Sequence, residues 1–180
     1  MGKQNSVFSA LLIIALSGAV ILLGSVFLNA ASVGQVLSNV QVRDANNKPA
    51  TIPHMGTKLI SIFYNDADAA DINDPLADAI KAKKFPDAKY KGMGIANLKD
   101  SKAPNFLIRK IVQGKIKKYN TTILTDPDLI LAKKWGLGDC NNTSVFILIG
   151  KDNRVKYVKK GAIRGEEINK IVNLIEELSR

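Results

Sequence analysis

Leu59-Ile-Ser-Ile-Phe-Tyr64 is a short, nearly continuous run of apolar, β-branched and aromatic residues. Such runs are typical of a central strand that is buried on both faces of a sheet. After the acidic stretch 65–74, Pro75 suits the first position of a helix over residues 75–84, with Asp74 as its cap. A buried strand that leads directly into a helix indicates an α/β fold.

The rest of the chain continues this alternation of strands and helices. Before the central strand, alternating residues 36–42 and the turn-rich stretch 44–49 predict a hairpin at the edge of the sheet. After it we expect strand 90–98, helix 103–118, strand 121–124, helix 126–136, a hairpin of strands 145–149 and 155–158, and a helix from Glu166 onward. These elements predict a three-layer α/β/α sandwich around a mixed central sheet.

The amino-terminal segment has the composition of an export signal. Lys3 is its only cation, residues 7–28 are mostly apolar, and the small residues 30–32 suit cleavage by a signal peptidase. The apolar run is longer than a signal peptide needs, which is about 7 to 15 residues, and is long enough to span a bilayer. We expect residues 1–32 to be a signal peptide or an amino-terminal membrane anchor, and residues 33–180 to be one domain on the periplasmic side.

The chain carries a formal net charge of +10, spread over scattered lysine pairs. Such pairs mostly form solvated surface, with attraction to anionic lipid headgroups or acidic partners as the functional alternative. Nucleic-acid binding would need cations gathered on one element with aromatic residues among them, whereas only 6% of this chain is aromatic. No nucleic-acid partner is expected.

The chain has a single cysteine, Cys140, and a single histidine, His54. These counts exclude an internal disulfide and a zinc site built from cysteine and histidine alone. Gly92 and Gly94 do not extend to a dinucleotide-binding fingerprint, and no phosphate-binding loop is present. We therefore expect no cofactor.

Several short stretches, spread over residues 33–180, carry a resemblance to a known family. They are 34–42, Pro75-Leu-Ala-Asp-Ala-Ile-Lys-Ala82, Phe85-Pro-Asp-Ala-Lys-Tyr90, Leu131-Ala-Lys-Lys-Trp-Gly-Leu137, 144–155 and Tyr157-Val-Lys-Lys-Gly161. Their order and spacing resemble the YtfJ-like exported proteins, which are relatives of the thioredoxin and peroxiredoxin superfamily. The resemblance implies a thioredoxin-like fold in the cell envelope, and it implies no particular reaction.

Redox-active members of that superfamily have a Cys-x-x-Cys pair where the first core strand meets the first helix, because the helix amino-terminus stabilises a thiolate. Here the junction reads Asn65-Asp-Ala-Asp-Ala-Ala-Asp71, without a cysteine. The superfamily's cis-proline, expected just before the hairpin strand, is replaced by Thr143. The first functional expectation is therefore a non-redox binding or assembly protein of the cell envelope, with an envelope protein as partner and possible association with the inner membrane.

Cys140 is the residue on which an alternative enzymatic function would depend. Its loop is expected to face the helix-start loop, so a one-cysteine thiol peroxidase or thiol-transfer enzyme is the second hypothesis, with Asn141, Asn142 and Thr143 as hydrogen-bond donors to the reacting group. The neighbouring Asp139 would raise the thiol pKa rather than lower it. A tolerated or partly buried thiol is the favoured interpretation.

Asp66, Asp68 and Asp71 place three carboxylates before a predicted helix. Such oxygens suit a hard cation such as calcium, but the stretch lacks the glycine and glutamate of an EF-hand loop. The favoured interpretation is stabilisation of the helix start. The same three aspartates, together with Asn142 and Thr143, are the candidate residues for binding a partner.

Overall fold

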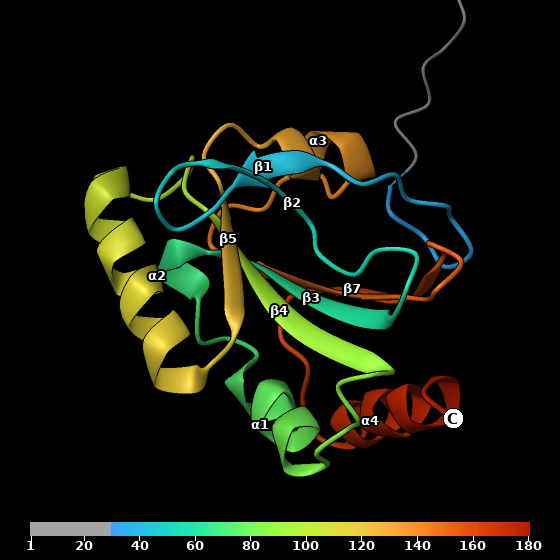
Figure 1. Cartoon of the computed structure of the whole chain (residues 1–180). Helices are drawn as coiled ribbons and strands as arrows, with labels where there is room; N and C mark the ends of the chain where they lie inside the picture. The colour runs from blue at the N-terminus through green and yellow to red at the C-terminus, as the bar shows by residue number, and fades with distance from the viewer. Residues whose placement is uncertain (1–29) are drawn as a thin grey trace, which may run out of the picture.

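A mixed sheet of seven strands lies at the centre of the protein, described here from a computed structural model that covers residues 30–180 (Figure 1). β3 (Leu59–Asp66) pairs in parallel with β4 and antiparallel with β6, so six of its eight residues are buried. The spatial order is β2-β1-β5-β4-β3-β6-β7. The other strands are β1 (Gln41–Arg43), β2 (Pro49–Thr51), β4 (Tyr90–Asn97), β5 (Thr122–Asp126), β6 (Ser144–Ile149) and β7 (Val155–Lys160). The predicted central strand is confirmed.

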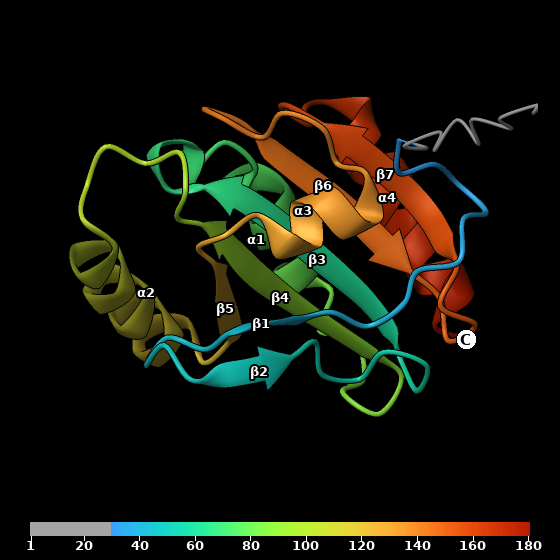
Figure 2. The same cartoon turned by 90° about the horizontal axis from the view of Figure 1, so that it is seen from above.

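Helices cover both faces of this sheet. α3 (Ile130–Trp135) lies on one side together with the β1–β2 hairpin, whereas α1 (Asp74–Ala82) and α4 (Glu166–Leu178) lie on the other (Figure 1). α2 (Asn105–Tyr119) lies at the β5 end of the sheet, and α4 lies by β7 at the other end (Figure 2). The predicted three-layer α/β/α sandwich with a mixed central sheet is confirmed.

The two faces of the sheet are packed differently. On the α3 face, side chains of β3 such as Ile62 and Tyr64 join one large apolar cluster with Trp135. On the opposite face the buried apolar residues form two separate clusters. One contains Leu59, Leu76, Ile80, Tyr90, Phe146, Leu148, Ile163, Ile171, Val172 and Ile175, beneath α1 and α4, and the other contains Ala45, Leu98, Ile108 and Val112, beneath α2. The sheet surface between these two clusters belongs mainly to β4.

The amino-terminal hairpin begins later than the alternating pattern predicts. Only Gln41–Arg43 form a strand, and Val36 makes an isolated antiparallel bridge with Arg154. The backbone N–H groups of Gly34 and Leu37 donate to the carbonyls of Val155 (2.8 Å) and Asn153 (2.9 Å). Residues 34–37 therefore lie beside the start of β7, and the chain reaches β1 only afterwards. The alternating pattern of residues 36–42 thus covers two separate stretches of backbone pairing.

The helix predicted over residues 126–136 begins four residues later, at Ile130, because Asp126 is the last residue of β5. The carboxylate of Asp126 nevertheless caps α3: Oδ1 accepts from Ile130 N (2.8 Å) and Oδ2 from Leu131 N (3.0 Å). Asp126 therefore satisfies backbone donors that the first turn of the helix cannot satisfy itself.

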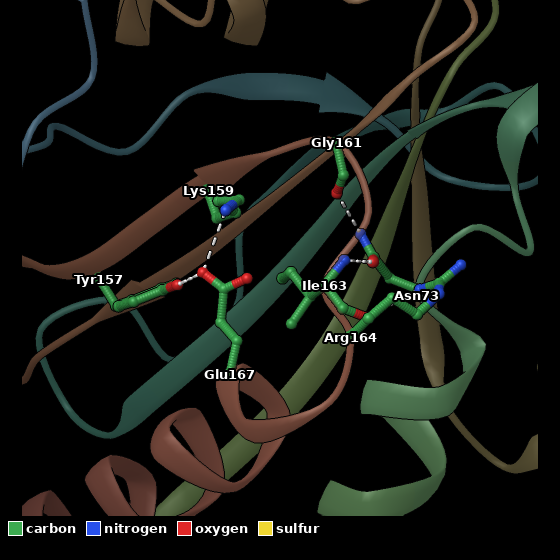
Figure 3. Close-up of polar contacts among 7 residues, drawn as sticks. All are labelled: Asn73, Tyr157, Lys159, Gly161, Ile163, Arg164 and Glu167. Atoms are coloured by element: carbon green, nitrogen blue, oxygen red, sulfur yellow. Dashed lines mark hydrogen bonds and ion pairs between the residues drawn. The ribbon is translucent and has the colours of Figure 1, made fainter.

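The start of α1 is held by Asn73 rather than by the predicted cap Asp74, which is the first residue of the helix. The buried Asn73 amide donates to Ser144 Oγ (2.9 Å) and Gly161 O (3.1 Å), and its Oδ1 accepts from Ile163 N (2.9 Å). Figure 3 shows the last two of these contacts. Asn73 thus ties α1 to the connection between β7 and α4.

A second set of polar contacts joins β7 to the first turn of α4. Glu167 Oε1 accepts a hydrogen bond from the hydroxyl of Tyr157 (2.6 Å) and forms an ion pair with Lys159 (3.2 Å) (Figure 3). These contacts lower the pKa of the Glu167 carboxyl, first through the Tyr157 hydrogen bond and then through Lys159. An ionised glutamate in the first turn of a helix also interacts favourably with the helix dipole.

The predicted signal peptide or membrane anchor, residues 1–32, lies outside the described residues except for its last three. Within residues 30–180, none of the helices has the length and apolar character needed to cross a membrane.

Candidate functional site

The parallel strands β3, β4 and β5 end side by side, and we call the end of the sheet that they form the carboxyl edge. Asp66 pairs in register with Asn97, and Asn97 with Asp126. All three side chains are fully buried. The loops that follow these strands therefore meet over a row of buried polar groups. A redox-active thioredoxin fold would have its thiol pair in the first of these loops, where this chain has the 3₁₀ helix Ala67–Ala69.

Asp66 fastens two loops of the carboxyl edge together. Its Oδ1 accepts from Asp68 N (2.9 Å), and its Oδ2 accepts from Asn142 N (2.9 Å). Its own backbone N–H donates to Thr143 O (2.9 Å). We call residues 66–71 and 139–143 the edge loops. Because one buried carboxylate bonds to both of them, their relative position is fixed by the fold.

A second buried carboxylate at this edge, Asp126, accepts a hydrogen bond from the hydroxyl of Tyr64 (3.1 Å). Burial raises the pKa of the Tyr64 hydroxyl well above its ordinary value, and the charge of Asp126 raises it further. Tyr64 is thus a neutral donor at any physiological pH. The pair links the end of β5 to the centre of β3 and leaves no hydroxyl available for chemistry.

Cys140 lies in the apolar cluster on the α3 face, with only 2% of its surface exposed. Its Sγ lies 3.5 Å from the carbonyl oxygen of Gly138 and 3.9 Å from that of Leu137. Burial raises the pKa of the thiol; Lys160 opposes this shift, and Asp139 adds to it. A thiol in this setting is a poor nucleophile, because the thiolate is the reactive form.

Two of the predicted donor residues around Cys140, Asn141 and Asn142, have N–H groups that bond elsewhere. Asn142 N donates to Asp66, and the Asn142 side chain donates to Asn141 Oδ1 (3.1 Å). Asn141 N donates to Asp139 Oδ1 (3.0 Å). The polar groups of this loop hold the loop in shape, so they do not form a ready cradle for a group reacting at sulfur.

A pocket of about 160 Å³ opens at the carboxyl edge, between α2 and the first edge loop. We call it the edge pocket. Its lining is almost entirely apolar and includes Ala67, Ala70, Ala96, Ile108, Ile111 and Val112. A dry cavity of about 150 Å³ lined by aliphatic residues can hold a molecule the size of benzene. The edge pocket is therefore large enough for one apolar side chain of a binding partner.

Exposed apolar residues lie on α2, and one of them, Ile111, lines this pocket. Phe106, Leu107 and Ile111 are 62%, 43% and 60% exposed. Cations accompany them on the helix, where Lys110 and Lys117 are also exposed, and the α2 sequence contains no acidic residue. Exposed apolar side chains are typical of an interaction site, and the cations of α2 favour an acidic partner on that side.

The three aspartates predicted for this region do not converge. Asp66 is buried and bonded as described, Asp68 is exposed, and Asp71 forms an ion pair with Lys115 (2.9 Å). Across residues 30–180, no three histidine, cysteine, aspartate or glutamate side chains are grouped as a metal site requires. Of the residues predicted to contact a partner, Asp68, Asp71 and Asn142 are exposed on the edge loops, and Thr143 is half-buried. Asp66 is too deeply buried to contact one.

Sequence reasoning missed the edge pocket and the pairing of Tyr64 with Asp126. The pocket forms because small residues, Ala70 and Ala96 among them, come from three separate segments. The tyrosine and the aspartate are 62 residues apart. The tyrosine in a strand predicted to be buried on both faces was the sign that a polar partner would be needed, since a buried hydroxyl is normally hydrogen-bonded.

Comparison with known proteins identifies the family. Residues 54–178 match the sequence model of a family described as "Bacterial protein of unknown function (YtfJ_HI0045)". The chain is 27% identical over 123 residues to the uncharacterized protein YtfJ of Escherichia coli, a match that covers 67% of this chain and 66% of the relative. A Haemophilus influenzae protein is 26% identical over 114 residues, covering 62% of this chain and 61% of the relative. The match thus covers about two thirds of the length of the Escherichia coli relative and less than two thirds of the Haemophilus influenzae relative.

Solved structures with the same fold include redox proteins. A thiol-disulfide oxidoreductase thioredoxin domain from Bacteroides vulgatus superposes with a TM-score of 0.59 at 14% identity, covering 83% of this chain and 99% of that domain. A peroxiredoxin-like protein from Aquifex aeolicus gives a TM-score of 0.56 at 14% identity, covering 83% of this chain and 89% of that protein. At such identities the likeness concerns the fold alone. The chain has a thioredoxin-like fold and belongs to the YtfJ family of bacterial proteins.

Proposed function

We propose that this protein is an exported, non-redox binding or assembly protein of the cell envelope, which uses the carboxyl edge to hold a partner protein. The observation that carries the proposal is the edge pocket. It adjoins the loop where redox-active relatives have their two thiols, and its lining is mostly apolar. A site of this kind suits binding, since it offers an apolar side chain a place to be buried.

Three further features support a partner protein at this edge. The edge loops are held rigidly by Asp66, so little conformational entropy is lost when a partner binds. Exposed Asp68 and Asn142 can form the polar rim of an interface, while the exposed Ile111 supplies apolar area at the pocket. The cations of α2 favour a partner with an acidic surface next to its apolar anchor.

Site-specific crosslinking in cells tests this proposal. A photoreactive residue replaces Asp68 or Asn142, and in a control it replaces Lys151, an exposed residue in the turn between β6 and β7. We expect Asp68 and Asn142 to crosslink to the same protein, and Ile111→Glu to weaken both crosslinks. Equal crosslinking from Lys151, or none from either edge position, would contradict the proposal.

Export and membrane association by residues 1–32 are part of the same proposal. The apolar length of residues 7–28 supports it, together with the single cation before them. Fractionation of the producing cell, with the amino-terminus of the recovered protein sequenced, distinguishes a cleaved signal from a retained anchor. Recovery of the intact chain in the cytoplasm would exclude both.

The competing hypothesis, a one-cysteine peroxidase or thiol-transfer enzyme, has one supporting observation: Lys160 acts to lower the pKa of Cys140. Burial acts in the opposite direction and is the larger effect. Peroxide consumption by the natural chain, compared with Cys140→Ser, decides between the hypotheses. A rate that depends on the cysteine would establish the enzyme and displace the binding proposal.

A further inference from the structure

A groove runs between α1 and α2, along the strip of sheet that separates the two apolar clusters on that face. Its volume is about 480 Å³, within the range of small-molecule binding sites. Phe63, Gly94 and Ile123 are in register on neighbouring strands and form its floor. Phe63 and Ile123 are only half-buried although their strands lie inside the sheet. An apolar strip in the middle of the sheet is thus only partly covered.

Gly94 is the residue that keeps this strip open, and close packing among residues 30–180 does not require a glycine there. The three atoms nearest to a Cβ at position 94 all belong to Ile123, and the shortest of these distances is an ordinary contact of 3.5 Å. Gly92, two residues earlier, is different, because a Cβ there would lie 3.1 Å from the hydroxyl of Tyr90 and 3.3 Å from that of Ser61. A strand glycine without an internal packing reason often marks a place where a ligand approaches the backbone.

The two ends of the groove differ in polarity. At the end formed by the last turns of α1 and α2, the walls carry Lys81, Lys84 and Lys91, while the nearby Asp87 is already paired with Lys91 (3.1 Å). Lys81 lies over the ring of Tyr119, 5.6 Å from its centroid, and the ammonium of Lys84 has no partner among residues 30–180. This end is therefore net positive.

The opposite end of the groove leads to the edge pocket, which shares its walls. Phe63, Ala70, Gly94 and Ile123 line both hollows, together with Asn65 and Lys115. Carboxylates face the groove along its α1 wall, at Asp74 and Asp78. The pocket beyond them has mostly apolar walls, and Lys115 at its entrance is paired with Asp71 (2.9 Å). The distance along β4 from Lys91 to Ala96 is five residue steps, or about 17 Å at about 3.3 Å per residue.

We propose that this groove binds an amphiphile with a single hydrocarbon chain and an anionic head, such as a fatty acid. The head lies at the end with Lys81 and Lys84, and the chain runs over Gly94 towards the edge pocket. Apolar contact with the floor and removal of the chain from water would supply most of the affinity. The inference rests on the proposed function to the extent that the tail of the ligand and the anchor of a partner protein share the edge pocket.

Titration with laurate tests the inference, using the protein as recovered from cells in detergent-free buffer. Calorimetry gives the affinity, and backbone amide shifts give the location. Dodecyltrimethylammonium has the same chain with a cationic head, and acetate has the head without the chain. We expect saturable laurate binding, at least about tenfold weaker binding of the cationic amphiphile, and no binding of acetate. Equal binding of both amphiphiles, or none of laurate, would overturn the inference.

Two substitutions locate the site. Gly94→Val fills the floor and should abolish laurate binding, whereas Lys84→Glu should weaken it about tenfold and leave the cationic amphiphile unaffected. Lys170→Glu makes the same change of charge at an exposed position of α4 that does not line the groove, and it should leave laurate binding unchanged. If the valine variant does not fold, the comparison of Lys84→Glu with Lys170→Glu still decides. Laurate binding that is unchanged by Lys84→Glu would overturn the inference.

The outcome is distinguishable from that of the proposed function. Crosslinks from positions 68 and 142 without any laurate binding would reject the proposed ligand and support the partner protein. Laurate binding without those crosslinks would support the ligand and reject the partner protein. Protection of the groove amides by the crosslinked partner, with no response to laurate, would make the groove part of a protein interface and overturn the inference.

Discussion

The thiol of Cys140 lies among apolar side chains, with two backbone carbonyl oxygens as its polar neighbours. Ionisation there would place a negative charge in a poorly solvated position next to the negative ends of two carbonyl dipoles. Both effects favour the neutral thiol. The lone cysteine is therefore best understood as a small apolar residue of the core, although Lys160 partly compensates for its burial.

We predict that Cys140 in the folded protein reacts slowly with iodoacetamide. Because its pKa is raised, the pH midpoint of the reaction should lie above that of a free thiol, which is about 8.5. Alkylation followed by mass spectrometry measures the rate at each pH. The same protein in denaturant is the control and should react like a model thiol. Fast reaction with a midpoint below about pH 7 would instead support the enzymatic hypothesis.

We predict that Asp66→Asn destabilises the protein by about 1 to 3 kcal/mol. The asparagine amide has one oxygen and one NH₂ group, so it would direct a donor at the N–H of either Asp68 or Asn142. Urea unfolding measures the change in the free energy of unfolding. The matched control Asp68→Asn changes an exposed carboxylate and should cost less than about 0.5 kcal/mol. Equal effects of the two substitutions would contradict the role given to Asp66.

At the scale of the elements, the first turn of α4 is where pH should act. Glu167 has a lowered pKa in the folded protein, so its ionised form stabilises the fold. That contribution is present above the unfolded pKa of about 4.3 and is lost as the pH falls through the folded value. We predict that Glu167→Gln loses less stability than the natural chain between about pH 6 and pH 3, as measured by urea unfolding at each pH.

Glu166→Gln is the control for this pH dependence. Glu166 is exposed and lies one residue before Glu167 on the same helix. This variant should keep the acid sensitivity of the natural chain. If the two variants respond alike to acid, the contacts of Glu167 with Tyr157 and Lys159 are not the source of the effect.

The order and type of the elements could be predicted because each depends on local pattern. The run beginning at Leu59 and the helical spacing after Glu166 both reflect burial on a single element. The boundaries of the elements were harder to predict from the sequence. Asp126, for example, is the last residue of β5, yet its side chain caps a helix that begins four residues later, after a turn. Asn73, which replaces the predicted cap Asp74, gains its importance from partners more than 70 residues away.

The candidate site was predictable only in outline. The position of the edge loops follows from the fold, so Asp68 and Asn142 could be placed there from the sequence. The burial of Asp66 could not be predicted, because the sequence shows it only as one of several aspartates in an acidic stretch, and Asp68 and Asp71 of that stretch are exposed. The edge pocket and the groove depend on small residues in separate segments, and a glycine such as Gly94 gives no sign in the sequence of whether packing requires it.

Considered as a whole, the molecule is unevenly packed on the face that carries α1, α2 and α4. Among the described residues, the cluster beneath α2 has four buried members and is separate from the rest of the core. α2 also contains Gly114, whose missing side chain weakens a helix by about 0.5 to 1 kcal/mol relative to alanine. α2 is therefore expected to open more readily than β3.

We predict that α2 amides exchange with solvent at least about tenfold faster than those of β3, as measured by native-state hydrogen exchange. Gly114→Ala should slow exchange in α2 about threefold to fivefold and leave β3 unchanged, because a Cβ atom at position 114 meets nothing within 4 Å. The unsubstituted β3 amides serve as the internal reference. Protection of α2 equal to that of β3 would show that the two clusters unfold as one unit.

The single buried sulfur of Cys140 has a consequence for how the protein is made. A chain with one cysteine cannot form or lose an internal crosslink, so its native state is the same under oxidising and reducing conditions. Its maturation needs neither a disulfide-forming catalyst nor a proofreading isomerase. Before folding, the same sulfur is accessible and can be captured by another thiol, whereas afterwards the packing of the α3 face shields it. Completion of folding is thus itself the step that removes this chain from the thiol exchange of its surroundings.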